Sequence, residues 1–155
     1  MRSLSLLLPL FLSSFAHASG PESFTGVWTG KGTYIRSEVL SQCQEFTLTF
    51  AGTRDSFEFV HGYRKCDHHD EEFTNVKMEA RNGELFFGGQ KVGTYTEDGW
   101  VKAAYSMPEG NGHVRNWRMT MHRQGDHVMY EESRTMDGEE TPLISFAGLL
   151  QKASR

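Results

Sequence analysis

Strand-length segments with alternating apolar side chains recur along this chain, and most of them end at a short turn signal. In one such row, Phe46, Leu48 and Phe50 alternate with threonines, as residues do when one face of a strand is buried. Asn82-Gly83 and Asp98-Gly99 are typical of two-residue hairpin turns, whose central residues need a positive φ. No segment shows the periodicity of a long amphipathic helix. The pattern therefore predicts an all-β fold.

About ten strands are expected, joined mainly by tight turns in sequence order. Residues 37–42 are expected to form one helical turn at most, and 67–72 a polar connection. Such a series favours a single antiparallel up-and-down barrel, because closure removes the two exposed edges of the sheet. The alternative is an open sandwich of the same strands with a solid core. The expected strands are 24–35, 44–51, 56–64, 73–80, 84–88, 91–96, 100–107, 114–123, 127–135 and 143–150.

The N-terminus predicts a cleavable signal peptide over residues 1–18. Arg2 supplies a positive charge, an apolar stretch follows from Leu4 to Phe15, and Ala16-His17-Ala18 gives the small-x-small cleavage pattern. The apolar stretch is too short for a membrane span, which takes about 20 residues. We therefore expect cleavage near Ala18 and export of a domain over 19–155 to the periplasm or out of the cell.

The charge balance excludes two classes of partner. Acidic residues outnumber basic ones, 20 against 16, whereas general nucleic-acid binding needs a basic surface. The same balance disfavours adhesion to anionic lipid, and no second long apolar segment predicts membrane insertion. The sequence identifies no partner protein.

Both cysteines lie beyond the predicted cleavage point, and in an oxidising compartment a pair is interpreted first as a disulfide. If residues 52–55 form the turn between two strands, Phe50 faces Phe57, and Cys43 lies opposite residue 64. Cys66 is two positions further on and within reach after a modest bulge. A bridge would close a loop of roughly 24 residues and contribute about 3 kcal/mol. Two free thiols are the alternative.

The first expected strand contains Gly26-Val27-Trp28, followed by further glycines and by Tyr34. This segment resembles the first strand of calycins, the superfamily of lipocalins and nitrobindin-like barrels. The resemblance implies that Trp28 plugs the barrel floor, that the glycines let the strand bend, and that the last strand, Ile144 to Leu150, pairs with the first. In lipocalins a basic residue stacks on this tryptophan, and Arg134 is the candidate here.

The resemblance does not extend to haem binding. Nitrobindins bind haem through a histidine near the C-terminal strand, but residues 128–155 contain no histidine. The proline that follows the tyrosine in their motif is also missing, since Ile35 follows Tyr34. We predict no haem and no other cofactor.

Aromatic and methionine side chains on the expected inner faces would either fill the core or line a cavity for a flat, apolar ligand. His61 shares the odd positions of its strand with Phe57 and Phe59, so it is expected on the same apolar face. It could contact a ligand, or it could be a hydrogen-bonded core histidine. The candidate ligand-binding residues are Trp28, His61, Tyr63, Tyr105, Trp117, Met119, Met121 and Tyr130.

Neither a metal site nor a catalytic site is predicted. His68 and His69 lie in an acidic run, but adjacent side chains on an extended chain point to opposite sides and do not easily share an ion. The sequence contains no nucleophile elbow, no His-Glu-x-x-His and no phosphate-binding glycine loop.

We therefore expect non-catalytic binding of a small apolar or aromatic molecule inside the barrel. The alternative is an envelope or secreted interaction protein with a packed core and no internal ligand. The first requires a cavity of a few hundred Å³, lined by Trp28, His61, Tyr105, Trp117 and Met119.

Overall fold

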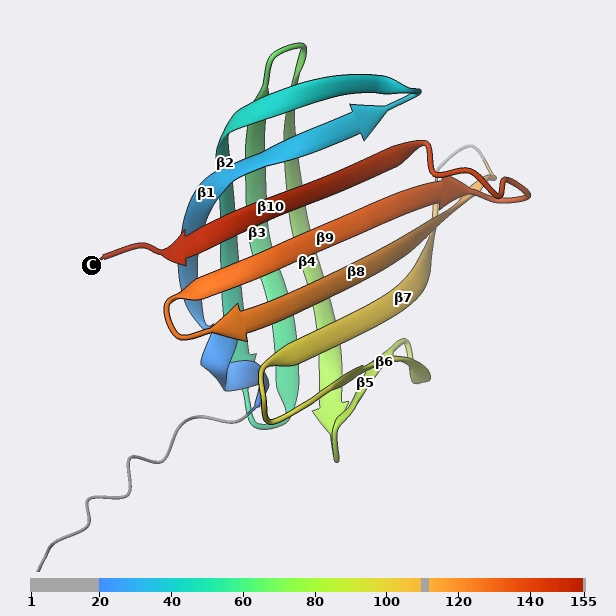
Figure 1. Ribbon diagram of the computed structural model, residues 1–155. Helices are drawn as coiled ribbons and strands as arrows, with labels where there is room; N and C mark the ends of the chain where they lie inside the picture. Colours follow the sequence, from blue (N-terminus) through green and yellow to red (C-terminus); the bar gives the residue numbers. More distant parts are fainter. Residues whose placement is uncertain (1–19, 110–111, 155) are drawn as a thin grey trace, which may run out of the picture.

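Each strand of this chain pairs with the next, and the last pairs with the first, in a computed structural model that describes residues 20–109 and 112–154 (Figure 1). The described residues thus form a closed antiparallel barrel, as predicted, and not an open sandwich. A short 3-10 helix, η1 (Pro21–Phe24), precedes the barrel. The strands are β1 (Gly26–Arg36), β2 (Val39–Thr53), β3 (Ser56–Cys66), β4 (His69–Arg81), β5 (Glu84–Phe87), β6 (Gln90–Tyr95), β7 (Trp100–Pro108), β8 (Val114–Gln124), β9 (His127–Met136) and β10 (Ile144–Lys152).

The predicted signal peptide over 1–18 lies outside the described residues, as do residues 110 and 111 of an expected turn. Among the residues that are described, no helix is long and apolar enough to cross a bilayer.

Two strands begin earlier than the sequence pattern indicated. β2 starts at Val39, so residues 39–42 are extended and not helical, and β4 starts at His69, so most of the expected polar connection is strand. The β1–β2 turn is tight because Ser37 and Glu38 both adopt positive φ, 47° and 68°. A two-residue turn lets strand pairing begin immediately on both sides.

The β2–β3 hairpin places the two cysteines face to face. Thr53 pairs with Ser56, so the turn has two central residues where a longer turn was expected, and Phe50 faces Phe59 instead of Phe57. The shorter turn moves the register beside it by two positions, and two irregularities follow, at Val60 in β3 and at Gln44 in β2, which cancel each other. Cys43 therefore lies directly opposite Cys66, and the two are joined by a disulfide. The predicted bridge is confirmed, and its partners face each other without the net shift that was expected of a bulge.

One extra residue in β3 reverses which side chains point inward. Thr49 pairs with His61 and Phe50 with Phe59, so Val60 has no partner in β2. A residue inserted in this way shifts the alternation by one position. His61 is consequently on the outer face, where its Nε2 lies 2.8 Å from the Glu72 carboxylate. The prediction that His61 shares the apolar face of Phe57 and Phe59 is therefore wrong, and so is the matching placement of Tyr63.

η1 lies at one end of the barrel (Figure 1), and Trp28 of β1, which contacts it, is buried. Its indole Nε1 donates a hydrogen bond to the Phe24 carbonyl oxygen at 2.6 Å, which fixes η1 across that end. The predicted stacking of Arg134 on this tryptophan is wrong. Lys152 of β10 lies near the ring instead, with Nζ 5.4 Å from its centroid, because β10 pairs with β1 at this level.

Gly30 is required for the contact between the first and last strands. A Cβ at this position would lie 2.1 Å from the Leu149 carbonyl oxygen, far inside van der Waals contact. The predicted pairing of β10 with β1 is confirmed, and it depends on this close approach of backbones.

Reduction of the Cys43–Cys66 bridge, or its replacement in a Cys43→Ser/Cys66→Ser variant, is expected to lower the free energy of unfolding by about 3 kcal/mol. The physical reason is the larger conformational freedom of the unfolded chain. Urea unfolding with and without reductant measures the difference. Equal stabilities, or two alkylatable thiols in the non-reduced protein, would contradict the assignment.

Candidate functional site

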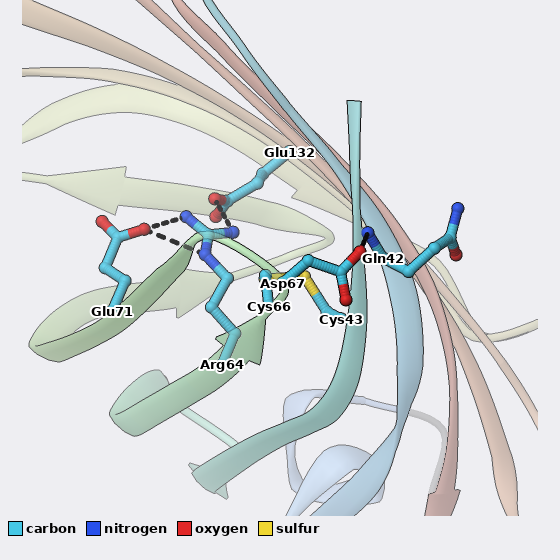
Figure 2. The surroundings of a disulfide bond; sticks show 7 residues. All are labelled: Gln42, Cys43, Arg64, Cys66, Asp67, Glu71 and Glu132. Atoms are coloured by element: carbon cyan, nitrogen blue, oxygen red, sulfur yellow. Dashed lines mark hydrogen bonds and ion pairs between the residues drawn. A yellow bond between two sulfur atoms is a disulfide. The ribbon is translucent and has the colours of Figure 1, made fainter. Parts of the chain in front are cut away.

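Four charged side chains from three strands meet inside the barrel. Arg64 of β3 donates from Nη1 to Glu132 of β9 at 2.8 Å and from Nε to Glu71 of β4 at 2.9 Å. Arg134 of β9 donates to the Glu132 carboxylate at 3.0 Å and also contacts Glu71. We call these residues the charge network: Arg64, Glu71, Glu132 and Arg134. Figure 2 shows Arg64 between the two carboxylates, close to the disulfide.

The four side chains of the charge network are largely buried, so the stability of the fold depends on their pairing. The side chains of Arg64 and Glu132 are fully buried, that of Arg134 is 2% exposed and that of Glu71 is 18% exposed. Removing a charged group from water costs several kcal/mol, and an opposite charge must compensate for it. Two arginines and two glutamates balance, so the network is neutral as a whole and each member depends on the others.

The two guanidinium groups of the charge network lie over the faces of aromatic rings. The Arg64 Cζ lies 4.6 Å from the Tyr34 ring centroid and 5.4 Å from that of Phe73. Phe73 lies over Gly62, where a Cβ would come within 2.1 Å of its ring. This glycine therefore leaves the space in which Phe73 contacts both arginines.

A cross-strand row extends the network into a stack of flat groups. Tyr105 of β7 pairs with Trp117 of β8, which pairs with Arg134 of β9. The two rings are nearly parallel, with an interplanar angle of 8° and centroids 6.1 Å apart. The guanidinium carbon of Arg134 lies 3.7 Å from the Trp117 centroid. Phe87 of β5 continues the contact, 5.6 Å from Tyr105.

The barrel wall is incomplete beside this stack. β4 pairs with β5 over Glu79–Arg81 alone, and β6 pairs with β7 over Gly93–Tyr95. In the described chain, the earlier part of β4 and the later part of β7 therefore lack a partner strand on the sides that face the short β5–β6 hairpin. Four inward aromatic side chains around this gap are half-buried, and we call them the aromatic cluster: Phe73, Phe87, Tyr105 and Trp117.

One donor of the charge network is left open next to the aromatic cluster. The Nε of Arg134 is buried and has no hydrogen-bond partner in the protein. A buried donor without a partner is unfavourable and is normally satisfied by an acceptor. The Arg134 guanidinium is also the group that stacks on Trp117, so an acceptor bound there would lie beside an aromatic surface.

This environment shifts the ionisation of Tyr34, Arg64, Glu71, Tyr105 and Tyr130, and the last three show how. Burial raises the pKa of Tyr130 and of Tyr105, and the negative charge of Glu132 raises both further. Tyr130 also donates its hydroxyl to Glu132 at 2.7 Å. Burial would raise the pKa of Glu71 as well, but the positive charges of Arg134 and Arg64 outweigh it and lower that pKa. At neutral pH the tyrosines are therefore neutral and Glu71 is charged.

The structure separates the predicted ligand-binding residues into four groups. Tyr105 and Trp117 are half-buried and belong to the aromatic cluster, and Tyr130 contacts the charge network. Trp28 belongs to the closed barrel floor, and His61 and Tyr63 lie on the outer face. The five side chains expected to line one cavity therefore do not lie together. Met119 and Met121 are buried in the core, as their strand periodicity indicated.

The charge network was not predicted, although part of its signal is visible. Tyr130, Glu132 and Arg134 alternate along one strand, which places two charges on the face that carries a buried tyrosine. Arg64 was not predicted because the extra residue at Val60 moves it to the inner face. Glu71 was not predicted because its segment was expected to be a polar connection and not a strand. Within residues 20–109 and 112–154, no group of three or more His, Cys, Asp or Glu side chains is arranged to hold a metal ion.

No protein-family model matches this chain, and no curated protein is similar to it in sequence.

Substitution of Glu132 by Gln is expected to lower the free energy of unfolding by about 3–5 kcal/mol, because it leaves two buried arginines facing one carboxylate. Glu131→Gln is the matched control, since Glu131 is the next residue on β9 and is exposed. It should change stability by less than about 0.5 kcal/mol. Urea unfolding measures both values, and similar losses for the two variants would contradict the role of the network.

Stability should fall at both extremes of pH. Because the pKa of Glu71 is lowered on folding, its contribution is present above about pH 4.3 and is lost as the pH falls through its folded value. Because the pKa values of Tyr105 and Tyr130 are raised, their contribution is present below about pH 10 and is lost as the pH rises further. Urea unfolding across this range tests both limbs. Tyr105→Phe/Tyr130→Phe should weaken the loss of stability at alkaline pH and leave the smaller part due to Tyr34, whose pKa burial also raises; an unchanged loss would contradict the assigned cause.

Proposed function

We propose that this protein is an exported, calycin-like carrier that binds a small, flat, apolar or aromatic molecule in its barrel without chemically changing it. The observation that carries the proposal is the aromatic cluster. Its four rings face the barrel interior but remain half-buried where the wall between β4 and β7 is incomplete. Rings that complete a core are normally covered, so this arrangement suits a ligand that covers them.

Three features at the barrel floor support the calycin assignment. Trp28 lies buried across the end that η1 covers, and its indole is hydrogen-bonded to that helix. A basic side chain from the last strand, Lys152, lies near its ring, in the role that the resemblance gives to a basic residue. The first and last strands close the barrel.

The chemistry around the cluster indicates what the ligand would offer. Tyr105 and Trp117 present nearly parallel rings, which favours a flat aromatic molecule bound by stacking. The open Nε–H of Arg134 favours one hydrogen-bond acceptor on that molecule. The charge network is neutral as a whole, so it does not by itself favour a charged ligand.

Export is supported by the disulfide. Cys43 and Cys66 are bonded within one hairpin, and structural disulfides persist in the periplasm or outside the cell rather than in a reducing cytosol. The predicted signal peptide leads to the same destination.

The fluorescent apolar amine N-phenyl-1-naphthylamine is a suitable probe for the aromatic cluster. In a Trp28→Phe/Trp100→Phe variant, Trp117 is the one remaining tryptophan. We expect this variant to bind the probe saturably, with energy transfer from Trp117 to the probe. In that background Tyr105→Ala should weaken binding by roughly tenfold, or about 1.4 kcal/mol, because it removes one face of the stack. Tyr63→Ala is the matched control, a tyrosine on the outer face.

The opposite result would favour the alternative function. Absence of saturable binding, or equal loss in Tyr105→Ala and Tyr63→Ala, would indicate a protein with a packed interior that acts through its surface. Native mass spectrometry of the protein purified from its own host adds an independent test. A retained small molecule that is displaced by the probe would support the carrier, and repeated recovery of bare protein would count against it.

A further inference from the structure

A pocket that shares no residue with the aromatic cluster lies between the β1–β2 and β3–β4 turns. It has a volume of about 280 Å³ and is lined by Tyr34, Arg36, Ser37, Ser41, His68 and His69, together with Val39. We call it the hairpin pocket. Its residues come from both turns and from the strand ends next to them.

Three links hold the two hairpins together at this pocket. The backbone N–H of Asp67 donates to the Gln42 carbonyl oxygen at 3.0 Å. The Asp67 carboxylate in return accepts from the backbone N–H of Gln42 at 3.0 Å (Figure 2). The Cys43–Cys66 disulfide lies one residue away from both. The pocket is thus preformed, which lowers the entropy cost of binding.

Every polar side chain that lines the hairpin pocket can donate a hydrogen bond, and no carboxylate lines it. Arg36 forms no ion pair with any of the described residues. Ser41 is 4% exposed and Tyr34 is 1% exposed. The Tyr34 hydroxyl is buried without a partner in the protein, so the pocket combines a cationic rim with buried hydroxyls.

The nearby charges reinforce this character. The Arg64 guanidinium that faces Tyr34 is already paired with two glutamates, so Arg36 is the cation that remains available. Arg36 follows Tyr34 by two residues on β1, and both side chains line the pocket. The carboxylate of Asp67, in the β3–β4 turn, accepts from the backbone N–H of Gln42.

We propose that the hairpin pocket binds a phosphate group, either free or carried by a small organic molecule. Such a group offers several acceptor oxygens and a negative charge, which matches a planar guanidinium, two imidazoles and three hydroxyls. The volume accommodates a phosphate with a small substituent. The site is independent of the aromatic cluster and does not require the proposed carrier function.

Titration of the disulfide-bonded protein with inorganic phosphate, followed by amide NMR at constant ionic strength, tests the proposal. We expect saturable shifts confined to residues 36–41 and 67–70. Arg36→Gln should weaken binding at least tenfold, and Ser41→Ala should weaken it less. Arg54→Gln is the matched control. Arg54 is an exposed arginine in the β2–β3 turn, and β2 separates it from the hairpin pocket.

Parallel titrations with phenyl phosphate and acetate define the ligand. Tighter binding of phenyl phosphate at the same residues would show that the phosphate is carried by an organic group, and tighter inorganic phosphate that it is free. Either result supports the site. Non-saturable shifts, equal effects of Arg36→Gln and Arg54→Gln, or acetate binding as tightly as phosphate would overturn it.

Discussion

The structure of the barrel around Arg64 depends on the mutual neutralisation of four charges in the charge network. Arg64 and Glu132 are completely removed from water, and neither is stable there without the other. The network joins β3 and β4 to β9, strands that are far apart in the barrel order. The network therefore connects opposite walls of the barrel, as apolar packing does near Trp28. Unlike apolar packing, its ion pairs need a fixed geometry, and the stability that they contribute depends on pH.

The network also organises the surfaces that carry the two proposals. Arg134 contacts Glu132 on one side and the face of Trp117 on another, so the aromatic cluster is oriented by a charge. Arg64 lies against the ring of Tyr34, which lines the hairpin pocket. Two sites of different chemistry are thus supported by one set of ion pairs, and loss of a single carboxylate is expected to disturb both.

Local patterns predicted the strands well because alternation and turn residues act over a few positions. The segment Phe46 to Phe50 and the Asn82-Gly83 turn show this directly. The site was predicted less well because register is a property of two strands at once. The unpaired Val60 moved Arg64 inward and His61 outward, and the two-residue turn changed which residues of β2 and β3 face each other; neither event has a signal in the alternation of one strand. Tyr105, Trp117 and Tyr130 were identified because no such event intervenes on their strands.

The sequence by itself determined the all-β fold and the succession of strands, because these follow from periodicity and turn chemistry, and it predicted the bridge between Cys43 and Cys66, which the register of β2 and β3 decided. Only the tertiary structure decided which charged side chains became core. That choice depends on partners distant in the chain: Arg64 and Glu132 are acceptable inside only because the barrel closes and brings them within 2.8 Å. A charge is costly to bury alone and acceptable when paired, so its position cannot be assigned strand by strand.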